Sequence, residues 1–163
     1  MASDPDSLLA IYLNDHLAGS TVGVELARRA RGANSGSELG QLLDRLVREI
    51  EEDRDTLGSV MDAVGARRDR LKQAAAWAGE KAGRLKLNGQ LTGYSPLSKL
   101  VELEGLNLGM EGKSRLWAVL AELADPRLSS FDFQALAERA ERQRSELEPF
   151  RLEAGRESFG AKR

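Results

Sequence analysis

The chain has 163 residues, 41% of them hydrophobic, and 24 lysines and arginines nearly balance 26 aspartates and glutamates, for a net charge of -2. This length suits one domain over residues 1–163, and the near-neutral charge argues against nucleic acid or an anionic membrane surface as a partner. The absence of cysteine excludes thiolate catalysis, zinc–thiolate sites and disulfides. No leader-like start and no apolar run of roughly 18 residues is present, so we expect a cytoplasmic protein outside the membrane.

Apolar residues recur at intervals of three and four, and residues typical of strands are scarce, so we predict an all-α protein. The first helix is expected over about 5–31, because Pro5 suits a first helical position and Gly32 follows the last turn. The second is expected over about 36–64, where a stripe of leucine, isoleucine and valine ends before Gly65.

The second half of the chain has a similar pattern after a long connection. A weakly amphipathic helix is predicted over 66–87, and further long helices over 96–124 and 130–155, with Pro149 kinking the last of these. Two long helices, a connection and two more long helices predict a four-helix bundle with one long, partly helical crossover.

This order of elements resembles the ferritin-like superfamily over most of the chain. The resemblance implies a core with two metal ions, held by one carboxylate from each of two helices and by Glu-x-x-His motifs on the other two. The only histidine, His16, lies in the first helix, and Glu52 and Glu141 stand where the motifs starting at Glu49 and Glu138 need histidine. The resemblance therefore implies a degenerate centre without metal or other cofactor. The stretches AAAWAGEKAGRLKLNG and SPLSKLVELEGLNLGMEGK also resemble segments of uncharacterised bacterial helical proteins, which implies no activity.

Polar residues interrupt the apolar face of every long helix when the residues are stepped at about 100° each. The residues that this places inward, or at the edge of the inward face, are Tyr12, Asp15, His16, Asp53, Glu102, Lys113, Gln143 and Arg144. Counting from the helix ends predicts a polar layer of His16, Asp53 and Lys113, with Gln143 or Arg144 nearby. The layer has two interpretations: an ionic layer that fixes helix register, or a ligand or metal pocket in the core. Lys113 favours the first, because an ammonium would repel a metal ion.

Glycines also lie on these apolar faces, although glycine is disfavoured inside helices by about 1 kcal/mol relative to alanine. We expect Gly19 to face Gly109 and Gly23 to face Gly105, which would make the first and third long helices the closest pair in the bundle. Leucine at position 109 should then overpack the core.

The stretch from 83 to 97 is a candidate partner-binding loop, in which Arg84, Lys86 and Tyr94 accompany several leucines. The alternative is that these leucines cover one end of the bundle, and Trp77 is likewise either packed on the bundle or a dimer contact. No catalytic residues are predicted. We therefore expect a non-enzymatic bundle that acts through protein contacts as a homo-oligomer, in the simplest case a dimer. The alternative is a ferritin-like metal- or small-ligand-binding protein, with oxidoreductase activity as one option.

Overall fold

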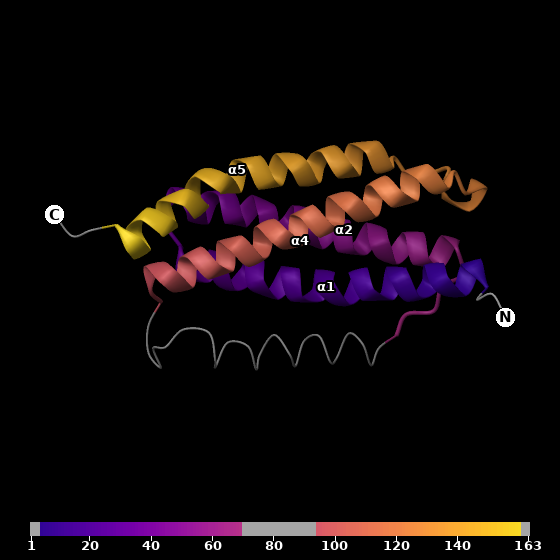
Figure 1. Ribbon diagram of the computed structural model, residues 1–163, viewed down its shortest axis with the longest axis horizontal. Helices are drawn as coiled ribbons and strands as arrows, with labels where there is room; N and C mark the ends of the chain where they lie inside the picture. The colour runs from indigo at the N-terminus through magenta and orange to yellow at the C-terminus, as the bar shows by residue number, and fades with distance from the viewer. Residues whose placement is uncertain (1–3, 70–93, 161–163) are drawn as a thin grey trace.

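The computed structural model describes residues 4–69 and 94–160, which form an all-α bundle of four long helices (Figure 1). The helices are α1 (Pro5–Ala33), α2 (Glu38–Ala63), α4 (Pro96–Leu123) and α5 (Phe133–Phe159), with a short 3-10 helix, η1 (Pro126–Leu128), between the last two. The predicted all-α class and the four long helices are confirmed. None of the helices in these two ranges is long and apolar enough to cross a membrane.

Each long helix begins where a polar side chain satisfies its first turn. The capping side chains accept hydrogen bonds from backbone N–H groups three residues later, and they belong to Asp4, Ser37, Ser95 and Asp132. Proline follows the cap in α1 and α4, where its missing N–H costs nothing. α5 continues through Pro149 to Phe159, beyond the predicted end.

The predicted helix over 66–87 is wrong at its start. Residues 66–69 are not helical, because the side chain of Asn14 on α1 takes up their backbone groups. Asn14 Nδ2 donates to the carbonyl oxygen of Arg67 at 2.9 Å, and the Asp69 N–H donates to Asn14 Oδ1 at 2.7 Å. The remainder of that predicted helix, with Trp77, Arg84 and Lys86, lies outside the described residues.

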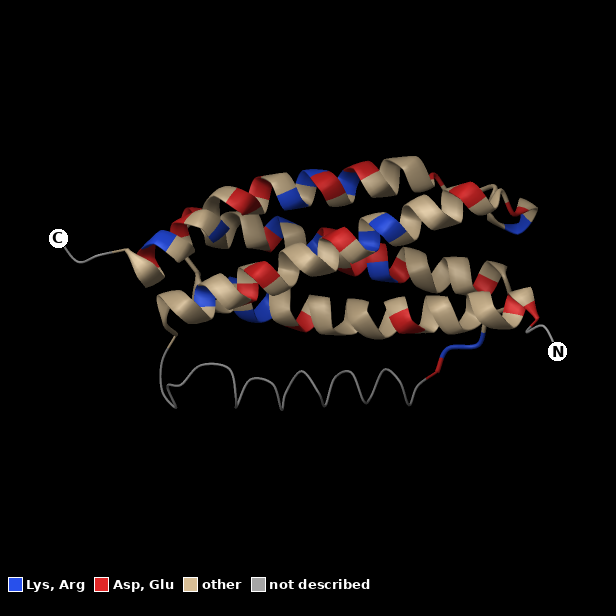
Figure 2. Ribbon diagram, in the orientation of Figure 1, with Lys and Arg blue, Asp and Glu red and all other residues tan. Residues whose placement is uncertain are grey.

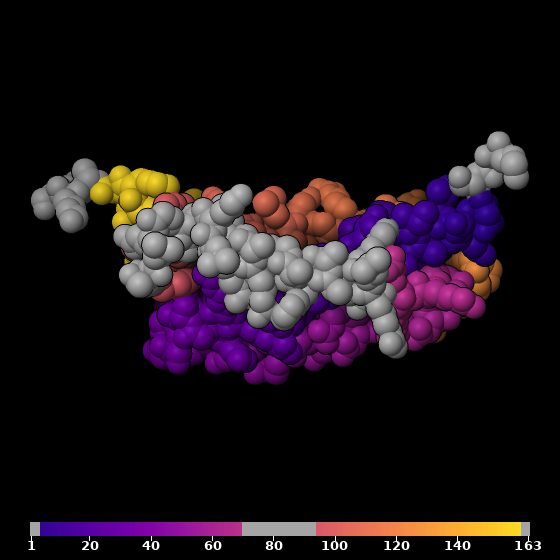
Figure 3. Space-filling model, turned by 90° about the horizontal axis from the view of Figure 1, so that it is seen from below, coloured from indigo at the N-terminus to yellow at the C-terminus, as the bar shows by residue number. Residues whose placement is uncertain are grey.

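The helices are arranged as two hairpins, α1–α2 and α4–α5, which lie side by side. α1 also packs against α4, and α2 against α5, whereas α1 and α5 are diagonal to each other, as are α2 and α4. Viewed from below, parts of α2 and α4 lie toward opposite long edges of the molecule (Figure 3), and α1 packs against both. α2 and α4 run in the same direction, so that α2 ends and α4 begins at opposite ends of the bundle (Figure 1).

The core consists of two apolar clusters separated along the bundle. One contains Leu43, Leu103 and Leu147, and the other contains Leu57, Trp117 and other large side chains. Between the two clusters each of α2, α4 and α5 contributes a polar residue. The candidate site begins at this break in the core.

Candidate functional site

A buried ionic network crosses the bundle between the two apolar clusters. The carboxylate of Asp53, only 2% exposed, is held by the Lys113 ammonium and by the Arg139 guanidinium. Lys113 Nζ also donates to Gln143 Oε1 at 2.6 Å, and Gln143 Nε2 donates to Glu49 Oε2 at 2.8 Å. Three helices are therefore joined by charge-assisted hydrogen bonds at one level of the bundle.

Sequence reasoning missed Arg139, which reaches Asp53 from the edge of α5 and also pairs with Glu52 at 3.2 Å. Arg139 lies four residues before Gln143, and residues at this spacing lie on the same side of a helix. This spacing was the sequence signal that could have placed Arg139 near the layer. Its long stem lets the guanidinium reach inward from a partly exposed position. Asp53 consequently faces two cations rather than the single one that was expected.

Burial shapes the ionisation of Lys113. Desolvation lowers the pKa of Lys113 below its ordinary value, and the nearby positive charge of Arg139 acts in the same direction. The carboxylate of Asp53 opposes both effects, by charge and by hydrogen bonding. The ammonium is retained in the core by its contact with that carboxylate.

Arg144 is not part of the layer, although it was one of two alternatives for it. Its Nε donates to Asn107 Oδ1 at 3.1 Å, and its guanidinium pairs with Glu111 and, at 2.9 Å, with Glu141. These partners lie on the outer side of α4 and α5, so Gln143 alone represents α5 among the predicted residues.

Glu102 also belongs elsewhere. It is 5% exposed and pairs with Arg29 at 2.8 Å, nearer the end of the bundle where α4 begins. Tyr94 lies at the same end, where its hydroxyl accepts a hydrogen bond from Asn34 at 3.1 Å. Burial raises the pKa of Tyr94, so this hydroxyl stays protonated.

A cleft of about 470 Å³ opens between α1 and α4, directly against the ionic network. Asp53 and Lys113 line it together with Ile50 and Leu57. The other lining residues are Tyr12, Asp15, His16, Gly19, Ser20, Gly23, Arg54, Gly105, Leu106, Gly109, Met110, Gly112, Leu116 and Trp117. The predicted residues Tyr12, Asp15 and His16 therefore border the same space as Asp53 and Lys113.

His16 forms part of the cleft wall. Its ring meets Tyr12 edge-on, with the ring centroids 4.6 Å apart. Desolvation lowers the pKa of His16, and the charge of Asp15 opposes this only in part. The imidazole is accordingly neutral near pH 7 and adds no charge to the cleft.

The prediction that glycines bring α1 and α4 into the closest contact is wrong. The hairpin partners α1–α2 and α4–α5 pack more closely. Among the described residues, a methyl group added at Gly19, Gly23, Gly109 or Gly112 would meet no atom within 4 Å. Only at Gly105 would it meet a neighbour, Leu26 Cδ2, at 2.9 Å. The Leu26 side chain lies between α1 and α4 at Gly105 and separates the two backbones there. The other glycines of the two helices therefore border open space and do not bring the backbones into contact.

Trp117 is a wall residue that sequence reasoning did not single out. The residue is 1% exposed and stacks on Phe133, with ring centroids 6.0 Å apart. Its indole nitrogen is buried and has no hydrogen-bond acceptor in the described part of the chain. Its position one turn after Lys113, on the same helix face, was the signal in the sequence.

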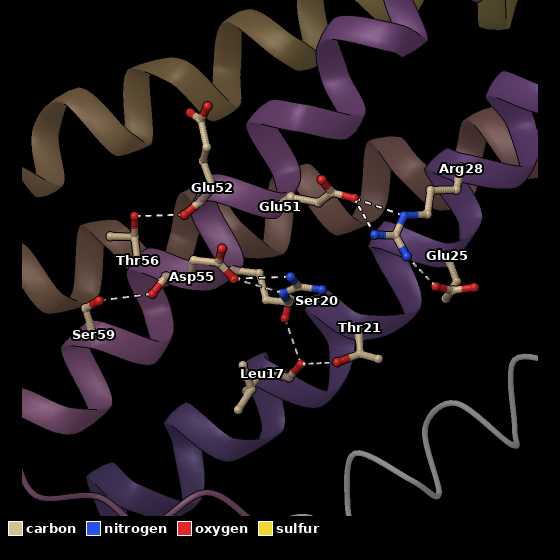
Figure 4. A network of polar contacts seen from close by, with 11 residues as sticks. Leu17, Ser20, Thr21, Glu25, Arg28, Glu51, Glu52, Asp55, Thr56 and Ser59 are labelled. Carbon is tan, nitrogen blue, oxygen red and sulfur yellow. Dashed lines mark hydrogen bonds and ion pairs between the residues drawn. The ribbon is translucent and has the colours of Figure 1, made fainter.

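On the surface shared by α1 and α2, the polar side chains drawn in Figure 4 form hydrogen bonds and ion pairs with each other or with their own helix. The hydroxyls of Ser20 and Thr21 both donate to the Leu17 carbonyl oxygen, at 2.7 and 3.1 Å, so they are engaged by their own helix. Arg28 pairs with Glu51 and Glu25 across the exposed face. Acidic and basic residues are interspersed along the helices seen in Figure 2, as expected of solvated faces.

The part of the chain that the structure describes contains no group of three histidine, aspartate or glutamate side chains that could hold a metal ion. No protein-family model matches the sequence, and no curated protein or solved structure has significant similarity to it. The ferritin-like relationship, the homo-oligomer and the cytoplasmic location stay predictions.

Proposed function

We propose that this protein binds a small, largely apolar molecule in the cleft between α1 and α4. The observation that carries the proposal is the cleft itself: its volume of about 470 Å³ lies within the range of roughly 300–1,000 Å³ typical of small-molecule sites. Its apolar wall and few converging polar groups also match such sites. This develops the small-ligand alternative recognised in the sequence, without a metal.

The glycines of the cleft support this proposal. Alanine at Gly19, Gly23, Gly109 or Gly112 would touch no neighbour in residues 4–69 and 94–160, and it would favour the helix by about 1 kcal/mol at each position. Glycine therefore keeps the cleft as wide as the two backbones allow. A ligand would restore the dispersion contacts that the open wall lacks.

The ionic network supports the proposal in a second way. Asp53 and Lys113 border the cleft, and their contacts with Arg139 and Gln143 join α2, α4 and α5. One side of the cleft is thus held by buried charged groups whose partners are on three helices. Such a wall is preorganised, which reduces the entropy lost on binding.

The proposal is tested with N-phenyl-1-naphthylamine, an uncharged dye that fluoresces strongly in apolar surroundings. We expect saturable binding of one dye molecule per chain. Gly109→Leu should fill the cleft and weaken binding by at least about tenfold, which corresponds to about 1.4 kcal/mol. Gly32→Leu is the matched control, because position 32 has equal room for a side chain but does not line the cleft.

Two results would contradict the proposal. Equal dye affinity in Gly109→Leu and the unmodified chain would place the dye elsewhere. No saturable binding, together with a lower thermal midpoint for Gly109→Leu, would mean that another part of the chain or a second copy fills the cleft.

A further inference from the structure

We infer that the ligand carries an uncharged hydrogen-bond acceptor on its apolar body, such as the oxygen of a ketone, amide or alcohol. This inference rests on the proposed function and specifies the chemical class of its ligand. The donors of two residues that line the cleft, Trp117 and Lys113, and the charges around them support it.

The first donor is the indole N–H of Trp117. An indole nitrogen can donate but not accept, and this one is buried without an acceptor among residues 4–69 and 94–160. A buried donor left unpaired costs free energy, and an acceptor on the ligand would remove that cost. Trp117 lines the cleft, and its Nε1 atom is closed off from solvent, so a ligand in the cleft reaches the N–H only after neighbouring side chains shift.

The second donor is the ammonium of Lys113, which has three N–H bonds. Within the described ranges, its hydrogen bonds go to Asp53 and Gln143. No acceptor in this part of the chain takes the third N–H, which we assign to the ligand. Lys113 and Trp117 are one helical turn apart on the same face of α4 and both line the cleft, so one ligand can contact both residues.

The charges around the cleft favour an uncharged ligand. The lining carries both signs of charge, so an ion of either sign would face a like charge; a carboxylate would face Asp15 and Asp53. An ammonium would face Lys113 and Arg54. A buried ion without a free partner is strongly disfavoured, whereas a neutral oxygen needs only the donors present.

The test is displacement of the same dye from the unmodified protein by compounds that share one alkyl chain: an alkane, its methyl ketone, its carboxylate and its primary amine. We expect the ketone to compete at a concentration at least about tenfold lower than the alkane, equivalent to about 1.4 kcal/mol. The carboxylate and the amine should compete more weakly than the ketone. A carboxylate or amine that competes best, or an alkane equal to the ketone, would overturn the inference and leave the proposed function standing.

An NMR measurement locates the acceptor. In a Trp77→Phe background, Trp117 supplies the only indole N–H signal, since the chain has two tryptophans. Saturating ketone should shift this proton downfield relative to saturating alkane, and Trp117→Phe should reduce the preference for ketone while leaving alkane affinity nearly unchanged. An indole signal that is identical with ketone and alkane would contradict the role of Trp117. Failure of the dye to bind at all would instead refute the proposed function.

Discussion

The two lines of contact between the hairpins, α2–α5 and α1–α4, are built differently. The backbones of α2 and α5 approach each other less closely than those of α1 and α4. Yet long polar side chains fill the wider contact, where Arg139 reaches Asp53 and Gln143 reaches Glu49. The narrower contact holds the cleft, because glycine supplies no side chains to fill it. Side-chain length, rather than the distance between backbones, decides which contact is filled.

The two regions share Asp53 and Lys113, which take part in the network and also border the cleft. A ligand in the cleft would therefore touch groups on which the packing of three helices depends. Variants on the two sides should behave in opposite ways, with the network sensitive to deletion and the cleft tolerant of added volume.

The largest effect is expected from Asp53→Ala, which leaves the buried cations Lys113 and Arg139 without their shared carboxylate. Breaking a buried ion pair from one side costs about 3–5 kcal/mol, and urea denaturation measures it. Asp53→Ala with Lys113→Met should recover only part of this loss, because Arg139 remains. Asp55→Ala, at an exposed residue on the same helix, is the control and should change stability by less than about 0.5 kcal/mol. Strictly additive effects of the two network variants would show that Asp53 and Lys113 do not interact.

A medium effect should separate two glycines on α4. A side chain at Gly105 meets Leu26 at once, so Gly105→Leu should destabilise the fold by about 1–3 kcal/mol through overpacking. Gly109→Leu enters open space and should be neutral or stabilising by up to about 1 kcal/mol, because leucine favours the helix. Thermal midpoints of the two variants decide the matter. Equal destabilisation by both would mean that the cleft is not open in solution.

The smallest effect concerns pH and His16. Its folded-state pKa is lowered by desolvation from the ordinary value of 6.5, so the folded protein binds this proton less readily than the unfolded chain does. The resulting loss of folding stability is absent above pH 6.5 and grows as the pH falls through the lowered pKa. The thermal midpoint of the unmodified protein should therefore fall more than that of His16→Gln between neutral and mildly acidic pH. Parallel curves would indicate that the ring is solvated and does not face an apolar cleft.

The sequence alone determined where the long helices lie and at which level of the bundle the buried ionic network interrupts the apolar core. Apolar spacing and the capping residues Ser37 and Ser95 set the helix starts, since these signals act within one turn. The constant rise of 1.5 Å per residue also let a count along each helix place Asp53 beside Lys113 and near Gln143. The prediction of a helix starting at residue 66 was wrong because the Asn14 side chain hydrogen-bonds the backbone of residues 67 and 69. Asn14 lies far from these residues in the sequence, so no local pattern reveals this contact.

Only the tertiary structure decided how the helices are rotated and spaced. It brings Arg139 rather than Arg144 to Asp53, pairs Glu102 with Arg29, and turns the glycines of α1 and α4 into the walls of a cleft. Position along a helix follows from the backbone, which is the same for every residue. Rotation and the distance between helices follow instead from the combined volumes of all side chains in the interior, and no single stretch of sequence contains that sum.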